Sequence, residues 1–452
     1  MSGSLIGGIV GAGLGYVTGG FSTAIGWTIG AFAGGLLDPG KLPDQYGPRI
    51  SDLNPQSSEY GKPIPIIYGG VAVAGNVIWA TPIVEVATTT ESGGKGGSTQ
   101  SSTAYSYFGN FAVLLGEGEY ELSKIWSGPD KRLIYDGGAL EGGQIRFYSG
   151  SGTQLPDPLI EAKLGAGRVP SYRGYCYIVF ENFPLEKDGN RLPFITAEIG
   201  KSGGSFSREL LSEVVKDLSL RSGLGSSEID ASELTDIVDG YILARPTTVR
   251  AAIETLRPTY YFDGVESFAK VKYVKRGGAI DCTIPDADLA ARPEGQVGPD
   301  PLVTVRQMEQ ELPNVVTVNY LVRAALYDPA AKIARRLIGH SREEVSLELP
   351  FVLSDTKAQQ VAEVNLHVPW VQRLMYTFNL SKKYSQLEPS DIVVVQGHVM
   401  RITKISEAAN RTLAIEAVAD DGATYTPNVA TTETPTLDQS VYITPSTRLE
   451  IL

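Results

Sequence analysis

Short hydrophobic runs separated by Gly, Pro and Asn fill the chain between residues 60 and 200. The runs are rich in β-branched and aromatic side chains, a pattern typical of short strands joined by turns. Residues 88–104 are mostly Thr, Ser and Gly, which predicts a mobile loop. The expected strands are Pro63–Val86 (two strands), Tyr105–Leu115, Glu119–Trp126, Ile145–Tyr148, Tyr175–Phe180 and Phe194–Ile199.

The hydrophobic period becomes helical after residue 204. Apolar residues at helical spacing predict one helix with Ser207 as a possible N-cap. A second helix is expected between Thr247, which can cap it, and Pro258, which ends it. The pair Asp263-Gly264 then predicts the turn of a hairpin. Together these elements indicate a small helix-plus-hairpin domain.

Strands return after residue 300, interrupted by one expected helix from about Ser354 to His367. Pro389-Ser390 predicts a turn between two of the later strands. The expected organisation is therefore mainly β with a small α+β insertion. Its parts are 1–40, an apolar segment; 41–204, a first β-rich domain; 205–278, the helix-plus-hairpin domain; 279–427, a second β-rich domain with one helix; and 428–452, a C-terminal tail.

The first forty residues differ from the rest, because no charged residue occurs from Leu5 to Leu37. Glycines recur there every four residues, which places them on one helical face where another backbone can approach closely. We expect a glycine-zipper hairpin; a flexible Gly-rich leader is the alternative. Each arm would span about 21 Å, short of a hydrocarbon core of about 30 Å. The residues expected to plug a lumen or contact a membrane are Gly7, Gly11, Gly15, Gly19, Gly26, Gly30 and Gly34.

Composition narrows the class of protein. The 452 residues exceed one hydrophobic core, and 50 Gly and 27 Pro with 42% hydrophobic residues disfavour a coiled coil or a wholly disordered chain. A formal charge of −12 disfavours nucleic-acid binding by phosphate neutralisation. Cys176 and Cys282 are too few for a four-thiolate metal site. We expect no metal and no cofactor.

No residue set has the spacing of a convincing catalytic site. His340, His367 and His398 lack helical zinc spacing. The string Gly200-Lys201-Ser202-Gly203-Gly204 resembles a nucleophile elbow, but the strand-helix alternation of a hydrolase is missing around it. Three carboxylate pairs occur, and we expect them to be surface groups. Because none of these residue sets is a convincing catalytic site, we do not expect the chain to be an enzyme. The carboxylate pairs are Asp157 and Glu161, Asp286 and Asp288, and Asp420 and Asp421.

A series of short motifs resembles, in order, the tail-tip or baseplate-hub proteins of long-tailed phages and gene transfer agents. The resemblance spans about residues 49 to 426. One departure is Ser390, where the family usually has Gly, and it puts a turn with positive φ in doubt. The motifs are Lys62-Pro-Ile-Pro-Ile-Ile-Tyr68-Gly69, Ala74-Gly75-Asn76-Val-Ile-Trp79, Phe147-Tyr148-Ser-Gly150, Pro156-Asp157-Pro158-Leu-Ile-Glu161, Tyr172-Arg173-Gly174-Tyr175, Gly189-Asn190-Arg191-Leu-Pro193, Asp239-Gly240-Tyr241-Ile-Leu-Ala-Arg245, Phe262-Asp263-Gly-Val265-Glu266-Ser267 and Leu349-Pro350.

The resemblance implies a homotrimeric ring at the distal end of a virion tail. In that ring, two tube-like β-barrel domains per subunit cap the tail tube and close its lumen before ejection. Implied partners are a distal tail protein and tail-tube ring, the tape-measure protein, and a fibre or receptor-binding protein. Two alternatives remain at this point: a membrane-inserting channel component for DNA delivery, and a tail-associated cell-wall hydrolase using Ser202.

Overall fold

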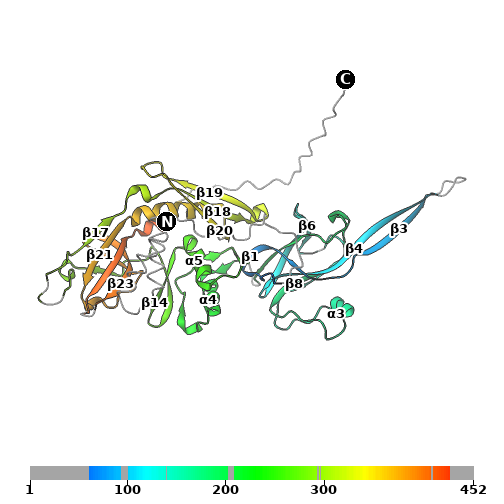
Figure 1. Cartoon of the computed structure of the whole chain (residues 1–452), viewed down its shortest axis with the longest axis horizontal. Coiled ribbons are helices and arrows are strands. Elements are labelled where there is room, and N and C mark those ends of the chain that lie inside the picture. Colours follow the sequence, from blue (N-terminus) through cyan, green and yellow to red (C-terminus); the bar gives the residue numbers. More distant parts are fainter. Residues whose placement is uncertain are drawn as a thin grey trace, which may run out of the picture.

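The computed structural model describes residues 61–92, 100–138, 140–201, 208–292, 295, 297–408 and 411–427. It confirms a mainly β, multidomain fold with few helices (Figure 1). The apolar segment 1–40, with its expected glycine zipper, and the tail 428–452 lie outside the described residues. No helix in the described ranges is long and apolar enough to span a bilayer.

The first β region is built around β1 (Ile66–Ala74), which belongs to two sheets at once. Its second half, Gly70–Ala74, pairs with β9, while its first half pairs with β13. The two sheets enclose a core of aromatic and branched side chains that includes Phe111 and Phe180, whose rings stack at 4.6 Å. The remaining elements here are β2 (Asn76–Ala80), β4 (Gln100–Glu117), β5 (Tyr120–Ser127), β6 (Arg132–Asp136), β7 (Gln144–Tyr148), α3 (Pro158–Leu164), β8 (Tyr175–Pro184) and β9 (Ile195–Lys201).

A long hairpin arm projects from this region (Figure 1). It consists of β3 (Val84–Ser92) and the first half of β4, which pair along the whole length of β3. Residues 88–92 and 100–104, expected in a mobile loop, are therefore paired in strands; only 93–99 lie outside the description. The cause is the high strand propensity of Thr, which the Gly and Ser content had masked.

The helical part contains α4 (Leu211–Arg221) and α5 (Val249–Tyr260). The capping predictions need correction. Leu210 is the N-cap residue of α4, so the helix starts too late for Ser207 to cap it. Thr248, rather than Thr247, caps α5 by accepting a hydrogen bond from Ala251 N at 3.2 Å. Pro258 lies inside α5 and does not end it.

The hairpin after α5 exists, but its turn lies elsewhere than expected. β14 (Phe262–Ser267) pairs with β15 (Lys270–Lys275), so Asp263-Gly264 is in a strand. Phe268 and Ala269 form the turn with φ of +46° and +60°. Both are non-glycine residues in a conformation that favours glycine, which explains why the turn was missed. Short strands complete this part: β10 (Glu209–Leu210), β11 (Ile229–Asp230) and β12 (Ile237–Val238).

One strand joins the first β region to the remainder. β13 (Gly240–Leu243) is hydrogen-bonded to β1 on one side and to β20 (Glu343–Val352) on the other. In the same sheet, β20 is followed in spatial order by β18 (Pro313–Val322) and β19 (Asp328–Arg335). Helix α6 (Asp355–Gln372) packs against β18 and β19. Ser354 caps α6, accepting from Lys357 N at 3.2 Å. A continuous sheet thus connects parts that are distant in sequence.

A separate six-stranded sheet closes the described chain, with its own core of apolar side chains. Ser390 has φ +79°, so the turn has a positive φ despite the missing glycine. In spatial order the strands are β16 (Cys282–Ile284), β22 (Ile392–Val395), β23 (His398–Glu407), β24 (Leu413–Ala419), β21 (Leu374–Leu380) and β17 (Val303–Arg306).

Candidate functional site

The glycines proposed as a lumen plug lie outside the described ranges, and so does most of the string that contains Ser202. Gly7 through Gly34 are all undescribed, as are Ser202, Gly203 and Gly204. The structure therefore gives no contacts for these residues. The nucleophile elbow at Ser202 and the glycine zipper both remain predictions.

The carboxylate pairs have structural partners. Asp157 is buried, caps α3 through Leu159 N at 2.9 Å and binds Arg146 Nε at 2.6 Å. Asp288 accepts from Lys383 and Tyr384. The surface expectation was thus wrong for Asp157, which holds a helix end in place.

The pair Asp420 and Asp421 is split between two environments. Asp420 is buried and accepts from Tyr425 OH at 2.9 Å, whereas Asp421 is exposed and caps the next turn through Ala423 N at 3.0 Å. The surface expectation was therefore wrong for Asp420. Burial raises the pKa of Asp420, although Arg401 opposes this effect.

The histidines are dispersed. His398 stacks on Tyr376 with ring centres 5.6 Å apart, and the backbone N of His340 donates to Glu309 Oε1 at 3.3 Å. His367 is exposed on α6. Within the described part of the chain, no three His, Cys, Asp or Glu side chains are grouped to hold a metal ion.

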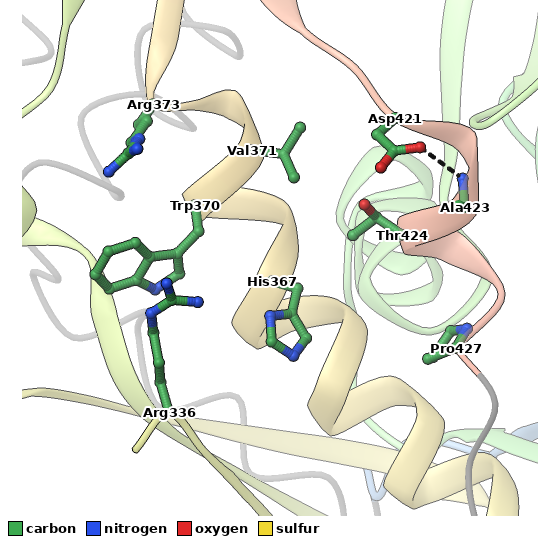
Figure 2. A pocket seen from close by; sticks show the side chains of 9 residues that line it. All are labelled: Arg336, His367, Trp370, Val371, Arg373, Asp421, Ala423, Thr424 and Pro427. Carbon is green, nitrogen blue, oxygen red and sulfur yellow. Dashed lines mark hydrogen bonds between the residues drawn. The ribbon is translucent and has the colours of Figure 1, made fainter. Parts of the chain in front are cut away.

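A pocket of about 400 Å³ lies between the end of α6 and the segment after β24 (Figure 2). An arginine side chain stacks on a tryptophan ring in the lining of this pocket. The Arg336 guanidinium lies over the Trp370 ring at 4.0 Å, and Trp370 Nε1 donates to Pro313 O at 2.8 Å. The lining residues are Arg336, His367, Trp370, Val371, Arg373, Asp421, Ala423, Thr424 and Pro427.

The arginine at the pocket has unused bonding capacity. Arg336 Nε is buried and has no hydrogen-bond partner among the described residues. A buried unpaired donor is costly to the fold. Arg373 adds a second cationic side chain to the lining (Figure 2). The lining of the pocket thus combines two cationic side chains with an aromatic ring and one carboxylate, that of Asp421.

An apolar loop stands beside the pocket. Leu337 is 90% exposed and Ile338 is 81% exposed, directly after Arg336. The loop is fastened to the segment that carries exposed Met308, since His340 N bonds Glu309. Exposed large apolar residues grouped in this way are a feature of binding and interaction surfaces. We call Arg336, Trp370, Leu337, Ile338 and Met308 the pocket surface.

A buried ionic cluster surrounds the side chain of Asp263. Asp263 accepts from Arg276 Nε at 2.7 Å and from Arg401 Nη1 at 3.1 Å, and Arg257 also binds it. Burial alone would raise the pKa of Asp263, but the three guanidinium groups outweigh burial and hold the pKa far below its ordinary range. The cluster connects α5, the β14–β15 hairpin and β23, so it joins the helical part to the last sheet.

Sequence reasoning missed the pocket surface and the ionic cluster. Members of the pocket surface come from different elements, for example Arg336 after β19 and Trp370 on α6. No local spacing brings such residues together. The sequence held one signal for the pocket surface. Two large apolar residues, Leu337 and Ile338, directly follow Arg336 in a segment that also contains turn residues.

Comparison with known proteins agrees with this picture. Residues 248–405 match the Phage-tail_3 family model, described as a putative phage tail protein. A chain in the virion of a native gene transfer agent particle has a similar fold, with TM-score 0.69 and 24% sequence identity, over 84% of this chain and 89% of that one. No curated protein matches the sequence.

Two further tail proteins are more distant. The 43 kDa tail protein of prophage MuSo2 from Shewanella oneidensis gives TM-score 0.33 and 11% identity, covering 76% of this chain and 99% of that one. A tail protein from Neisseria meningitidis MC58 gives TM-score 0.35 and 10% identity, covering 79% and 99%.

The described part of the chain is mainly β and carries exposed apolar side chains beside the pocket. The family model matches residues 248–405, about a third of the chain, and the gene transfer agent likeness shows a shared fold. They confirm the resemblance to phage tail proteins inferred from the sequence motifs, and they support a structural component of a phage or phage-like tail.

Proposed function

We propose that the protein is the hub of a tail tip: a ring of three copies at the distal end of the tail. The ring caps the tail tube, closes its lumen before ejection and anchors fibre or receptor-binding proteins. The observation that carries the proposal is the fold shared with a chain of a gene transfer agent virion over 84% of this sequence.

The connection between the two β regions suits a ring subunit. β13 is bonded to β1 and to β20, so backbone hydrogen bonds run without a break from one region to the other. Gly240 lies at this crossing, where an added Cβ would be 2.4 Å from Gly70 O. A rigid connection of this kind holds two contact surfaces at a fixed angle, which closure of a ring requires.

The pocket surface supports the anchoring role. Its exposed Leu337 and Ile338 would be covered by an apolar face of a fibre protein, and Arg336 would receive an acidic side chain. The distal tail ring and the tape-measure protein would contact other faces. A formal charge of −12 is compatible with a lumen along which DNA slides without binding.

Residues 1–37 are proposed to occupy the lumen. The seven glycines from Gly7 to Gly34 would let two helical arms pack closely as a plug or as a contact for the tape measure. Deletion of residues 2–37 should leave the trimer intact and impair DNA retention or delivery. Normal infectivity of such a virion would refute this role.

Two other functions are separable by experiment. If residues 1–37 insert into the host membrane as a channel component, the purified full chain should release dye from lipid vesicles and the deleted chain should not. A cell-wall hydrolase would clear peptidoglycan in a zymogram, and Ser202→Ala would abolish the clearing.

Electron microscopy of purified particles tests the hub proposal. Gold-labelled antibody against the chain should mark the distal end of the tail. Labelling along the tube, at the head-proximal end or on the capsid would contradict it.

A further inference from the structure

The hairpin arm leaves part of its backbone unpaired. β3 pairs with β4 from Val84 opposite Phe108 to Ser92 opposite Gln100. The pairing of β4 with β8 begins only at Phe108. Beyond that point the arm is a two-stranded ribbon in the described structure (Figure 1). Such a hairpin is marginally stable alone in water, so the arm needs another surface.

The outer edge of β3 can accept a further strand. Leu185 N donates to Tyr107 O at 2.9 Å, so the backbone groups of Tyr107 face β8 and not β3. Glu85, opposite Tyr107, is therefore in a non-hydrogen-bonded pair. Its N–H and C=O point outward, and by alternation so do those of Thr89. These are the unpaired groups of an edge strand.

β17 provides a second unpaired edge in the last sheet. It pairs with β21 alone and ends the strand order. Gln307 N donates to Arg373 O at 2.9 Å, which continues the β17–β21 register. Residues alternate in an antiparallel ladder, so Thr304 and Arg306 direct their N–H and C=O away from β21.

Side chains on the two edges are complementary. Val303 and Val305 share one exposed face of β17 with Met375, the cross-strand neighbour of Val305. Val84 and Val86 form an exposed apolar pair with the same two-residue spacing on β3. Between and beside these valines lie exposed Glu85 on the arm and exposed Arg306 on β17. Alignment of the two edges would cover the valines and bring opposite charges near each other.

We propose that β3 of one copy adds as a strand to β17 of the next copy. The arm and β17 lie at opposite ends of the long axis of the molecule (Figure 1), so a chain does not pair with itself. Contacts between different ends of successive copies run head to tail and close into a ring when the rotation allows it. The pairing rests on the proposed hub function, for which it supplies the contact between subunits.

A proline on the outward-facing backbone tests the edge. Thr304→Pro removes an N–H that points away from β21 and leaves the β17–β21 ladder intact. Thr304→Ala is the control because it keeps that N–H. We expect Thr304→Pro to weaken association of the full chain at least about tenfold in light scattering after gel filtration, with an unchanged melting midpoint. Unchanged association would overturn the proposal.

Thr89→Pro is the matching variant on the arm. It likewise removes an outward N–H of β3, and it should weaken association to a similar extent. If Thr304→Pro fails to fold, this variant decides the question. A Thr89→Pro protein that associates like the wild type would overturn the pairing.

Cross-linking separates this inference from the hub function. Val86→Cys and Val305→Cys chains, each with Cys282→Ser because Cys176 is buried, are mixed and treated with a short bismaleimide. A cross-linked adduct of two chains supports the pairing, whatever the number of chains in the oligomer. The control replaces Val305→Cys by Leu155→Cys, and there the adduct should be absent. A trimer without the adduct overturns the pairing alone. An adduct without a trimer overturns the closed ring alone, and absence of both overturns the two together.

Discussion

Replacement of Asp263 by Asn should strongly destabilise the junction between the helical part and the last sheet. The carboxylate is buried and binds guanidinium groups of Arg257, Arg276 and Arg401. Arg276 and Arg401 have side chains only 9% and 7% exposed, so neither can turn to water without moving the fold. The variant leaves those positive charges without their shared counter-charge.

The expected loss is about 3–5 kcal/mol of unfolding free energy, the cost of removing one partner from a buried ion pair. For a cooperative unit of about 150–250 residues this corresponds to a fall in melting temperature of roughly 6–20 °C. Differential scanning calorimetry of the purified chain measures it. Glu254→Gln is the control, because its pair with Arg250 is exposed and should change stability by less than about 0.5 kcal/mol. Equal melting temperatures for Asp263→Asn and the control would refute the reasoning.

The same substitution has a pH signature. The folded-state pKa of Asp263 lies below its unfolded value because of the arginines. Its contribution is therefore fully present above the ordinary carboxyl pKa of about 3.9 and is lost as pH falls toward the folded-state pKa. Between about pH 4 and pH 2, the unfolding free energy of the wild type should fall more steeply than that of Asp263→Asn. Parallel curves would contradict the assignment.

Three further substitutions test separate features. Ser390→Gly should stabilise the chain by about 0.5–1 kcal/mol in denaturant unfolding, since φ is +79°, while Ser385→Gly at φ −65° should destabilise it. Gly240→Ala should lower the free energy of unfolding by about 1–3 kcal/mol, because its Cβ would lie 2.4 Å from Gly70 O. Gly138→Ala, with open space around it, should leave the free energy of unfolding nearly unchanged in the same assay. Leu337→Asp should leave the melting temperature unchanged yet reduce the number of fibres per particle seen by electron microscopy, because Leu337 is 90% exposed.

Local patterns predicted much of the secondary structure. The helix expected from about Ser354 is confirmed, with Ser354 as its N-cap and buried Ala358 and Val361 on its inner face. Its spacing and its capping residue agree, so tertiary context had little to override. The hairpin turn at Phe268-Ala269 escaped prediction because bulky residues with positive φ give no sequence signal.

Long-range features were beyond reach of the sequence. The Asp263 cluster gathers arginines from three elements, and the pocket surface joins Arg336 to Trp370 on α6. Only the folded topology determines such neighbours. The arm shows a different failure: Thr-rich strands and Thr-rich loops have similar composition, and the pairing with β4 decides between them.

The oligomeric state of the purified full chain tests the central claim most directly. Light scattering coupled to gel filtration should give three times the 48.5 kDa mass of one chain. A monomer, a dimer or an open-ended series of larger species at the concentrations found in assembled particles would contradict the hub.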